Sequence, residues 1–273
     1  MPYGTLTFRW IRDNARIVTL LCAVVSQGFG IGASIAADDK AISVATRPNL
    51  PPYVIGDATS GIEISIVKAI FREMGEAVTF VQMDRVAMIE RFEKGEIGGT
   101  LTQSSTASSH GCITDWYIVH QNVGFSLARK NMKVNSLADL STRSVVSFDN
   151  AKTFLGDPFK AAMDANPNYR EIAPQSRQIG MLYKGAVDVI VGDEWIIRYV
   201  QRQHFEKTGE YEDLRLHQIL APTLYSARFQ DKLTCSKFNA ALKKLRTNGT
   251  YANILLDYQQ RLTRPVEKAS RIQ

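Results

Sequence analysis

In the first third of the chain, segments with the hydrophobic period of a strand alternate with segments that have the period of a helix. Residues 42–46 form an apolar run of strand length, and the prolines that follow end it. Apolar residues then recur at every fourth position, as on one face of a helix; they are Ile62, Ile66, Ile70 and Met74. Gly75 is a typical helix end. Residues 78–81 and 97–102 are predicted strands and 86–92 a predicted helix, so the order indicates a parallel sheet covered by helices.

A second series of strand and helix patterns follows, with a helical tail. Strands are predicted over residues 125–128, 144–148, 187–191 and 223–229. Helices are predicted over residues 136–140, 153–165, 178–183, 194–203, 238–245 and 251–258. We therefore expect an α/β fold with two sheets. In such folds, ligands bind beyond the carboxyl ends of the strands and in the cleft between two domains.

Residues 17–37 have the layout of a secretory signal peptide. Three arginines precede an apolar run that softens into glycine, alanine and serine. They are Arg9, Arg12 and Arg16. An uncleaved membrane anchor is the alternative, but Gln27 and several glycines interrupt the run well short of about 20 residues. Cys22 follows Thr-Leu-Leu, a poor lipidation signal. We expect cleavage after Ala36 or Ala37 and a soluble, exported mature protein.

The charge is mild and evenly spread. The net charge of +6 includes +2 from the leader, which carries three Arg and one Asp, so the mature chain carries about +4. No segment concentrates this excess, and we expect no nucleic-acid partner. The composition is that of an ordinary globular protein without internal repeats.

Two cysteines, Cys112 and Cys235, remain after removal of the leader. Export leads to a compartment where disulfides persist, so the two can pair or stay as separate buried thiols, and the sequence leaves both open. His110 and Cys112 are two candidate metal ligands without a second pair, which is a weak zinc signal. The sequence contains neither G-x-S-x-G nor H-E-x-x-H. We expect no metal, no cofactor and no hydrolase activity.

Eight short motifs, in this order, resemble family 3 of the bacterial extracellular solute-binding proteins, the polar amino-acid group. They lie at residues 49–53, 61–64, 95–97, 114–117, 136–140, 185–188, 238–242 and 248–251. The resemblance implies the type II periplasmic-binding-protein fold. In that fold, each of two lobes is a mainly parallel sheet flanked by helices, and a two-strand hinge joins them.

The resemblance also implies boundaries for the lobes. The leader covers residues 1–37, the first lobe 38–124 with a return segment and C-terminal helices at 220–273, and the second lobe 125–219. The hinge strands are expected near residues 122–124 and 220–222. Function would follow from closure of the lobes on a ligand.

The implied function is that of a periplasmic solute-binding protein. It would capture a small polar solute, an amino acid or a related carboxylate or amine, and deliver it to the membrane permease of an ABC transporter. We expect a monomer that is not an enzyme. Two alternatives remain: a periplasmic enzyme of this fold, similar to cyclohexadienyl dehydratase, and a ligand sensor for a membrane partner.

Members of this family hold an amino-acid carboxylate with an arginine after the third strand and the ammonium with an aspartate of the second lobe. Asp193 stands at the position that matches the aspartate, although it is also a suitable helix N-cap. Residues 102–113 contain no arginine, and His110 lies near the expected place. The resemblance therefore makes an ordinary α-amino acid doubtful and leaves the ligand open.

Other candidate ligand contacts come from three segments. Hydroxyl groups follow the third predicted strand, at Thr102, Ser104 and Ser105. Tyr53 resembles the family's ligand-lining aromatic residue, with packing under the proline loop as the alternative. Asn150 and Ala151 begin a helix whose free N–H groups form a candidate anion site.

Overall fold

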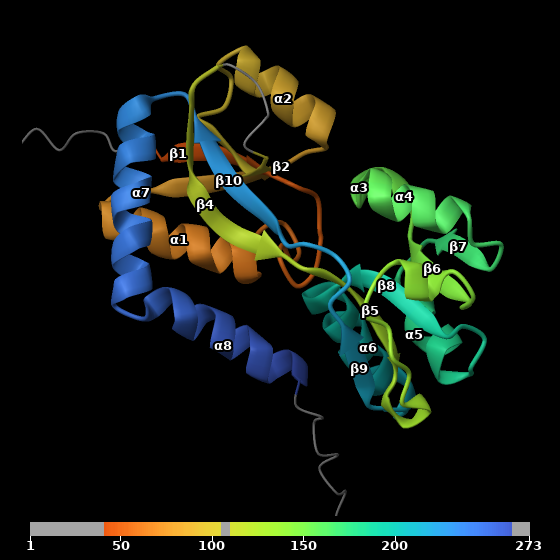
Figure 1. Ribbon diagram of the computed structural model, residues 1–273. Coiled ribbons are helices and arrows are strands. Elements are labelled where there is room, and N and C mark those ends of the chain that lie inside the picture. The colour runs from red at the N-terminus through yellow and green to blue at the C-terminus, as the bar shows by residue number, and fades with distance from the viewer. Residues whose placement is uncertain (1–40, 105–109, 264–273) are drawn as a thin grey trace, which may run out of the picture. The chain divides into compact units, whose positions relative to one another are not determined.

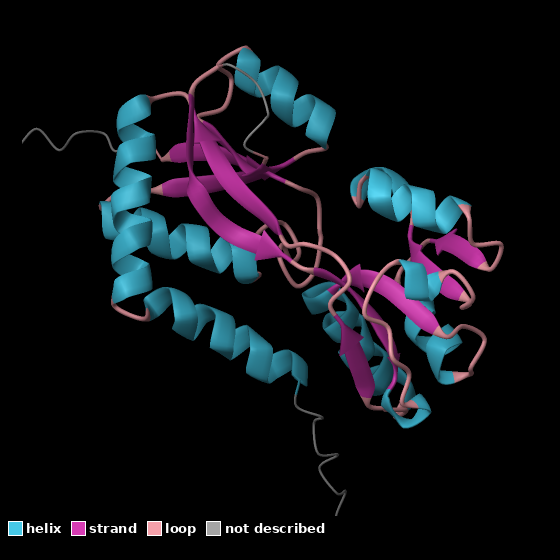
Figure 2. Ribbon diagram, viewed as in Figure 1, coloured by secondary structure: helices cyan, strands magenta, loops and turns pink. Residues whose placement is uncertain are grey.

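The computed structural model describes residues 41–104 and 110–263, whose helices and strands are drawn in Figures 1 and 2. The predicted leader and Ser105 lie outside these residues. Within 41–104 and 110–263, no helix combines the length and the apolar character needed to cross a bilayer.

The first sheet contains five strands in the order β2-β1-β3-β10-β4. Their bounds are β1 Ile42–Thr46, β2 Val78–Gln82, β3 Gly99–Gln103, β4 Cys112–His120 and β10 Thr223–Phe229. β1 runs parallel to β2 and β3, whereas β10 is antiparallel to β3 and β4. The helices associated with it are α1 Ile62–Met74, α2 Arg85–Glu93, α7 Lys232–Thr247 and α8 Thr250–Thr263. The late strand β10 is thus inserted between strands from the start of the chain.

Successive side chains of β1 pack on opposite faces of the first sheet. Val44 belongs to the large core cluster that includes α1 and α7, while its neighbour Ala45 packs with Met88 and Phe92 of α2. Successive strand side chains point to opposite faces, so one short strand serves two helical layers. Figure 1 shows α1 and α7 on one side of the sheet and α2 on the other.

The second sheet has the order β7-β6-β8-β5-β9. Its strands are β5 Asn122–Leu127, β6 Val145–Phe148, β7 Tyr169–Ile172, β8 Val189–Asp193 and β9 Leu214–His217. β6 is parallel to β7 and β8, and β5 is antiparallel to β8 and β9. The α-helices are α3 Ala151–Phe154, α4 Asp157–Asp164, α5 Ser176–Tyr183 and α6 Glu194–Thr208, and the 3-10 turns are Ala128–Lys130 and Ala138–Leu140. Val145 packs on the side of α4 and Val146 on that of α5, again by alternation.

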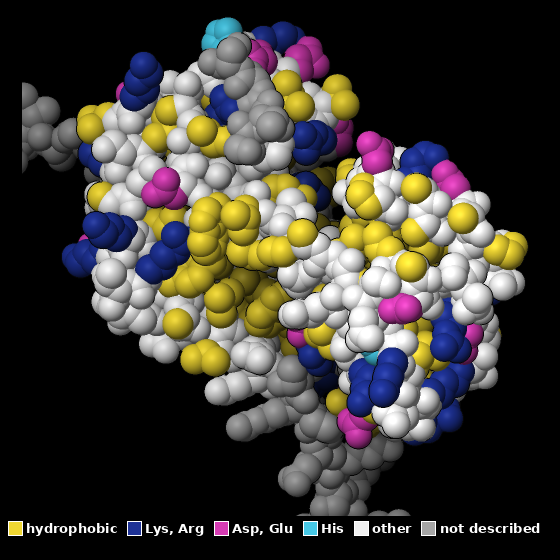
Figure 3. Space-filling view, in the orientation of Figure 1, with side chains coloured by type: hydrophobic (Ala, Val, Ile, Leu, Met, Phe, Trp, Pro, Cys, Tyr) yellow, Lys and Arg dark blue, Asp and Glu magenta, His cyan; other side chains and the backbone are white. Residues whose placement is uncertain are grey.

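The sequence pattern missed three strands, β4, β7 and β9, and all three are sheet edges. An edge strand has fewer neighbours to bury its side chains, so its polar and apolar residues mix. On β4, for example, Trp116 is 39% exposed. Figure 3 shows hydrophobic side chains gathered over β4 and the nearby end of α1.

One predicted helix is divided in the structure. A single helix was expected over residues 153–165, but α3 ends at Phe154 and α4 starts at Asp157. Gly156 between them has φ 86°, a positive value that favours glycine and that no helix interior accepts, and Pro158 lies in the first turn of the second helix. The break turns α3 into a short, separate element.

Two chain segments connect the sheets. Only Gln121 lies between β4 and β5, and residues 218–222 lie between β9 and β10. The Gln121 side chain donates a hydrogen bond to the Leu220 carbonyl at 2.9 Å, which joins the two connections. Figure 1 shows both connections running side by side.

A disulfide joins Cys112, the first residue of β4, to Cys235 of α7, with the Cα atoms 6.3 Å apart. It links residues 123 positions apart. Of the two alternatives left open by the sequence, the structure has the bridge. The bridge ties an edge strand to the helix that covers it.

Candidate functional site

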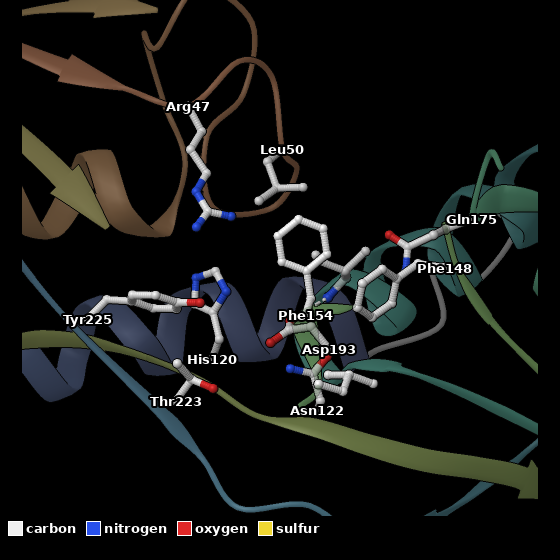
Figure 4. A pocket seen from close by; sticks show the side chains of 12 residues that line it. Arg47, Leu50, His120, Asn122, Phe148, Phe154, Gln175, Asp193, Thr223 and Tyr225 are labelled. Carbon is white, nitrogen blue, oxygen red and sulfur yellow. Dashed lines mark hydrogen bonds between the residues drawn. The ribbon is translucent and has the colours of Figure 1, made fainter. Parts of the chain in front are cut away.

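A cavity of about 220 Å³ is lined by residues from both sheets (Figure 4). Those from the first sheet and its loops are Arg47, Leu50, His120, Thr223 and Tyr225. Those from the second are Asn122, Phe148, Phe154, Leu155, Gln175, Asp193 and Ile196. The lining therefore combines aromatic rings with one arginine and one carboxyl group.

Arg47 directly follows β1 and is the only basic residue of the cavity lining other than histidine. Its guanidinium carbon lies 5.6 Å from the centre of the Tyr225 ring. Among the described residues, no side chain forms an ion pair or hydrogen bond with it. An arginine in this position keeps its fork of N–H donors available for an anion.

Sequence reasoning missed Arg47, because the resemblance directed attention to the segment after the third strand. The signal was present: Arg47 is the only basic residue of the loop that connects β1 to α1. Loops at the carboxyl ends of parallel strands are where α/β folds bind ligands.

His120 ends β4 and presents a neutral imidazole to the cavity. Its ring stacks on Tyr53, with centroids 3.9 Å apart, and meets Tyr225 edge-on at 4.9 Å. Burial and the neighbouring Arg47 charge lower the pKa of His120 to about 3. Its buried Nε2 makes no hydrogen bond within the described residues.

Asp193 ends β8 and caps α6. Its carboxyl group accepts hydrogen bonds from the N–H groups of Trp195, Ile196 and Gln121 at 3.0–3.1 Å. The Tyr53 hydroxyl donates to both of its oxygens at 2.9 Å. Burial raises the pKa of Asp193 to about 7, against the lowering effect of these donors.

Tyr53 is fully buried and does not line the cavity. Its ring lies behind His120, and its hydroxyl reaches Asp193, a contact between the loop after β1 and the second sheet. Tyr53 therefore supports two lining residues from behind.

Thr102 lies in the core, in a buried cluster with Glu63. Its hydroxyl donates to Glu63 Oε1 at 2.7 Å, and the Tyr117 hydroxyl donates to the same oxygen. Thr102 has φ 54°, an uncommon conformation for a β-branched residue, and this backbone turn accompanies its contact with Glu63. Burial raises the pKa of Glu63 above its usual value. The cluster fixes the start of α1 against β3 and β4.

The remaining candidates after β3 lie apart from the cavity lining. The His110 side chain is 65% exposed, with Nδ1 2.6 Å from Glu93 Oε2. Ser104 directly follows β3 and is not a lining residue, and Ser105 lies outside the described residues.

The predicted anion site at the start of α3 is already occupied by the protein. Asn150 adopts a left-handed conformation with φ 62°, and its N–H donates to Glu171 at 2.8 Å. The N–H of Lys152 donates to the other oxygen of Glu171 at 2.9 Å. Ala151 is buried between them. The expectation of free N–H groups is wrong here, because a carboxylate 19–21 residues further along takes them.

Phe148 and Phe154 form an aromatic wall that sequence reasoning did not identify. Their ring centroids lie 6.4 Å apart, and Phe154 is 69% exposed. Figure 4 shows the Phe154 ring and the Arg47 guanidinium directed toward the same space. The two rings together give the cavity an apolar side, and ligand pockets are lined mainly by apolar and aromatic side chains.

Within residues 41–104 and 110–263, no three His, Cys, Asp or Glu side chains gather as a metal site.

Residues 42–261 match the model of the bacterial extracellular solute-binding proteins, family 3. A search of curated protein sequences found no significant match. Solved structures are similar in fold. An ancestral cationic amino acid solute-binding protein has a TM-score of 0.61 at 18% identity, over 81% of this chain and 95% of its own.

Two further structures resemble the chain to the same degree. The second substrate-binding domain of a putative amino acid ABC transporter from Streptococcus pneumoniae has a TM-score of 0.60 at 19% identity, over 80% of this chain and 99% of its own. A histidine kinase sensor domain similar to periplasmic binding proteins has a TM-score of 0.58 at 19% identity, over 80% and 96%. These likenesses and the two helix-flanked sheets confirm the predicted fold class.

Proposed function

The chain belongs to family 3 of the bacterial extracellular solute-binding proteins, and on that premise we propose that it captures a small organic carboxylate in the cavity around Arg47. It holds the solute without changing it chemically and delivers it to the permease of an ABC transporter. The boundaries given above for the leader, the two lobes and the hinge are part of this proposal.

The observation that carries the proposal is the availability of Arg47. Its guanidinium makes no ion pair or hydrogen bond with any described residue, yet it faces a cavity. A charged group held this way lacks a partner that a ligand carboxylate supplies in bidentate form. Thr223, Asn122 and Gln175 add neutral hydrogen-bonding groups to the same lining.

Two features that suit a protein exported from the cytoplasm support the same function. The leader-like residues 17–37 and the Cys112–Cys235 disulfide both suit an oxidising compartment outside the cytoplasm. We propose a mature, monomeric protein in the periplasm that diffuses to its membrane complex.

Binding without chemistry is favoured over catalysis by the state of Asp193. A general base needs a free lone pair within reach of the ligand's proton. Asp193 already receives hydrogen bonds from Tyr53, Gln121 and the start of α6. Conversion of a bound ligand to a new product during incubation would contradict this part of the proposal.

A sensing role is the second candidate, favoured by the likeness to a histidine kinase sensor domain. The two roles differ in the membrane partner. Stimulation of a co-reconstituted permease's ATPase by ligand-loaded protein is expected for transport. Ligand-dependent activation of a membrane kinase without such stimulation would identify a sensor instead.

The direct test is calorimetry of the exported protein against small carboxylates, amines and amino acids. Replacing Arg47 with Ala removes charge-assisted hydrogen bonds of about 1.5–3 kcal/mol, so affinity for the bound carboxylate should fall about 10- to 150-fold. The matched control is Arg85→Ala, an exposed arginine at the start of α2. Equal affinity of Arg47→Ala and the native protein would refute the carboxylate site.

A further inference from the structure

The lining of the cavity indicates the chemical class of the solute as well as the presence of an anion site. We propose that the solute is an aromatic monocarboxylate without an ammonium group, an inference that rests on the proposed function. Such a ligand differs from the amino acids after which several proteins of similar fold are named.

The charged residues of the cavity lining indicate how many ionic groups the ligand has. Arg47 is the only Arg or Lys among the lining residues, and Asp193 is the only Asp or Glu. One arginine matches one carboxylate. An α-amino acid would need a second, acidic partner for its ammonium group.

Asp193 has no acceptor position left for an ammonium group. Its two oxygens offer about four lone-pair positions. Four donors occupy them: the Tyr53 hydroxyl and the N–H groups of Gln121, Trp195 and Ile196. Three of these donors belong to the backbone and cannot turn away, because they form the hinge and the start of α6.

Three other carboxylates of the two sheets are engaged in contacts of their own. Glu194 pairs with Arg198 at 2.8 Å, and Glu171 holds the start of α3. Glu63 lies in the core, where Thr102 and Tyr117 donate to it. None of these three lines the cavity.

The rings around the cavity suit an aromatic ligand body. Phe148 and Phe154 contribute from the second sheet, and His120 and Tyr225 from the first. Because His120 remains neutral, its imidazole offers a flat, uncharged face. Offset and edge-on ring contacts of this kind stabilise an aromatic group beyond the effect of its buried area.

The exposure of Phe154 is the strongest of these signs. Its ring is 69% exposed at the end of a four-residue helix, and α3 ends there because of Gly156. Folding gains little from a phenylalanine in this position. A ligand ring placed against it would bury the side chain.

The test is a matched series in calorimetry at pH 7.5: 3-phenylpropanoate, phenylpyruvate, L-phenylalanine and phenethylamine. The four share a phenyl ring and differ in the charged groups. We expect one or both carboxylates without an ammonium group to bind at least tenfold more tightly than L-phenylalanine, and phenethylamine to show no binding.

Phe154→Ala tests the ring contact separately. It should weaken binding of the aromatic carboxylate at least fivefold, while Tyr211→Ala, at a partly exposed ring outside the cavity lining, leaves it unchanged. Equal effects of the two substitutions would overturn the aromatic assignment.

The outcomes separate this inference from the function on which it rests. If L-phenylalanine binds as tightly as the better of the two carboxylates or more so, or if none of the four compounds binds, the inference is wrong. The proposed function survives both results as long as another carboxylate binds and Arg47→Ala weakens that binding at least tenfold. It fails if Arg47→Ala leaves carboxylate affinity unchanged.

Discussion

Asp193 and Arg47 illustrate how the environment of a single side chain decides its role. Both line one cavity, yet Asp193 accepts hydrogen bonds from four donors of its own protein, whereas Arg47 donates to no acceptor within residues 41–104 and 110–263. A buried group with all its partners stabilises the fold, whereas a charge without a partner is available to a ligand.

Asp193→Asn should lower the free energy of unfolding by about 1–3 kcal/mol, because an amide has one acceptor oxygen and sets an NH₂ group against N–H donors. The effect on carboxylate affinity should be much smaller than that of Arg47→Ala. Urea unfolding followed by tryptophan fluorescence measures the first quantity and calorimetry the second.

The control for this prediction is Asp149→Asn, at an exposed carboxylate that accepts a hydrogen bond from the adjacent Asn150 side chain at 2.8 Å. It should leave stability within about 0.5 kcal/mol of the native value. An Asp193→Asn protein as stable as this control would show that the four hydrogen bonds contribute nothing.

His120 should make stability depend on pH. Its pKa is about 3 in the folded protein and about 6.5 when unfolded. The unfolded chain therefore binds more protons between these values, and the stabilisation present above pH 6.5 is lost as the pH falls toward 3. Asp193, with its raised pKa, acts in the opposite direction between about pH 4 and 7.

A His120→Gln variant isolates the histidine, because Asp193 is present in both proteins. The difference in unfolding free energy between native protein and variant should shrink by up to about 1.4 kcal/mol per pH unit on acidification from pH 6 to pH 4. A difference that stays constant over this range would show that His120 is charged in the folded state.

At the scale of elements, short local devices position the site. The turn at Gly156 separates α3 from α4, and Glu171 of β7 closes the start of α3. On the other sheet, Glu63 connects α1 to β3 and β4. The first is a backbone turn and the other two are polar contacts between elements; they position α3, which ends at Phe154, and the start of α1, which follows the loop that carries Arg47.

The disulfide is the clearest test at this scale. A Cys112→Ser, Cys235→Ser double variant should lose about 2–5 kcal/mol of stability, since the bridge closes a loop of more than 100 residues in the unfolded chain. Denaturation in urea with and without reductant provides the comparison. Reductant should have no effect on the double variant, and a native protein that is insensitive to reductant would argue that the thiols are unbridged in solution.

At the scale of the whole unit, the two sheets are coupled through a few contacts beside the connecting segments. Gln121 links the connections, Tyr53 reaches Asp193, and Trp195 and Ile196 pack against the core of the first sheet. A ligand that touches Arg47 and Phe154 would add a further contact between the sheets. Closure of lobes around a ligand works by such shared contacts.

Ligand binding should therefore slow amide hydrogen exchange in residues 121–124, 218–222 and 148–155, and leave α2 unchanged. α2 serves as the internal control because none of its residues lines the cavity. Exchange followed by mass spectrometry of the same sample with and without ligand provides the measurement. Protection confined to the first sheet would contradict a ligand held by both.

The sequence alone determined the parts of this protein that depend on near neighbours. β1 and α1 have the bounds that the hydrophobic pattern predicted, because strand and helix periods are expressed within a few residues. The hydrophobic pattern did not predict the edge strands β4, β7 and β9, since the pattern of an edge strand depends on its neighbours in the sheet.

Tertiary structure alone decided which candidate residues meet. Asp193 accepts a hydrogen bond from Tyr53, 140 residues away, and Glu171 accepts one from the N–H group of Asn150 at the start of α3. Both contacts engage groups that the sequence offered as ligand sites, whereas Arg47 makes no ion pair or hydrogen bond within the described residues and lies beside the Tyr225 ring. The physical reason is that a polar group's availability is the balance of all donors and acceptors around it. That balance exists only once distant segments are packed together.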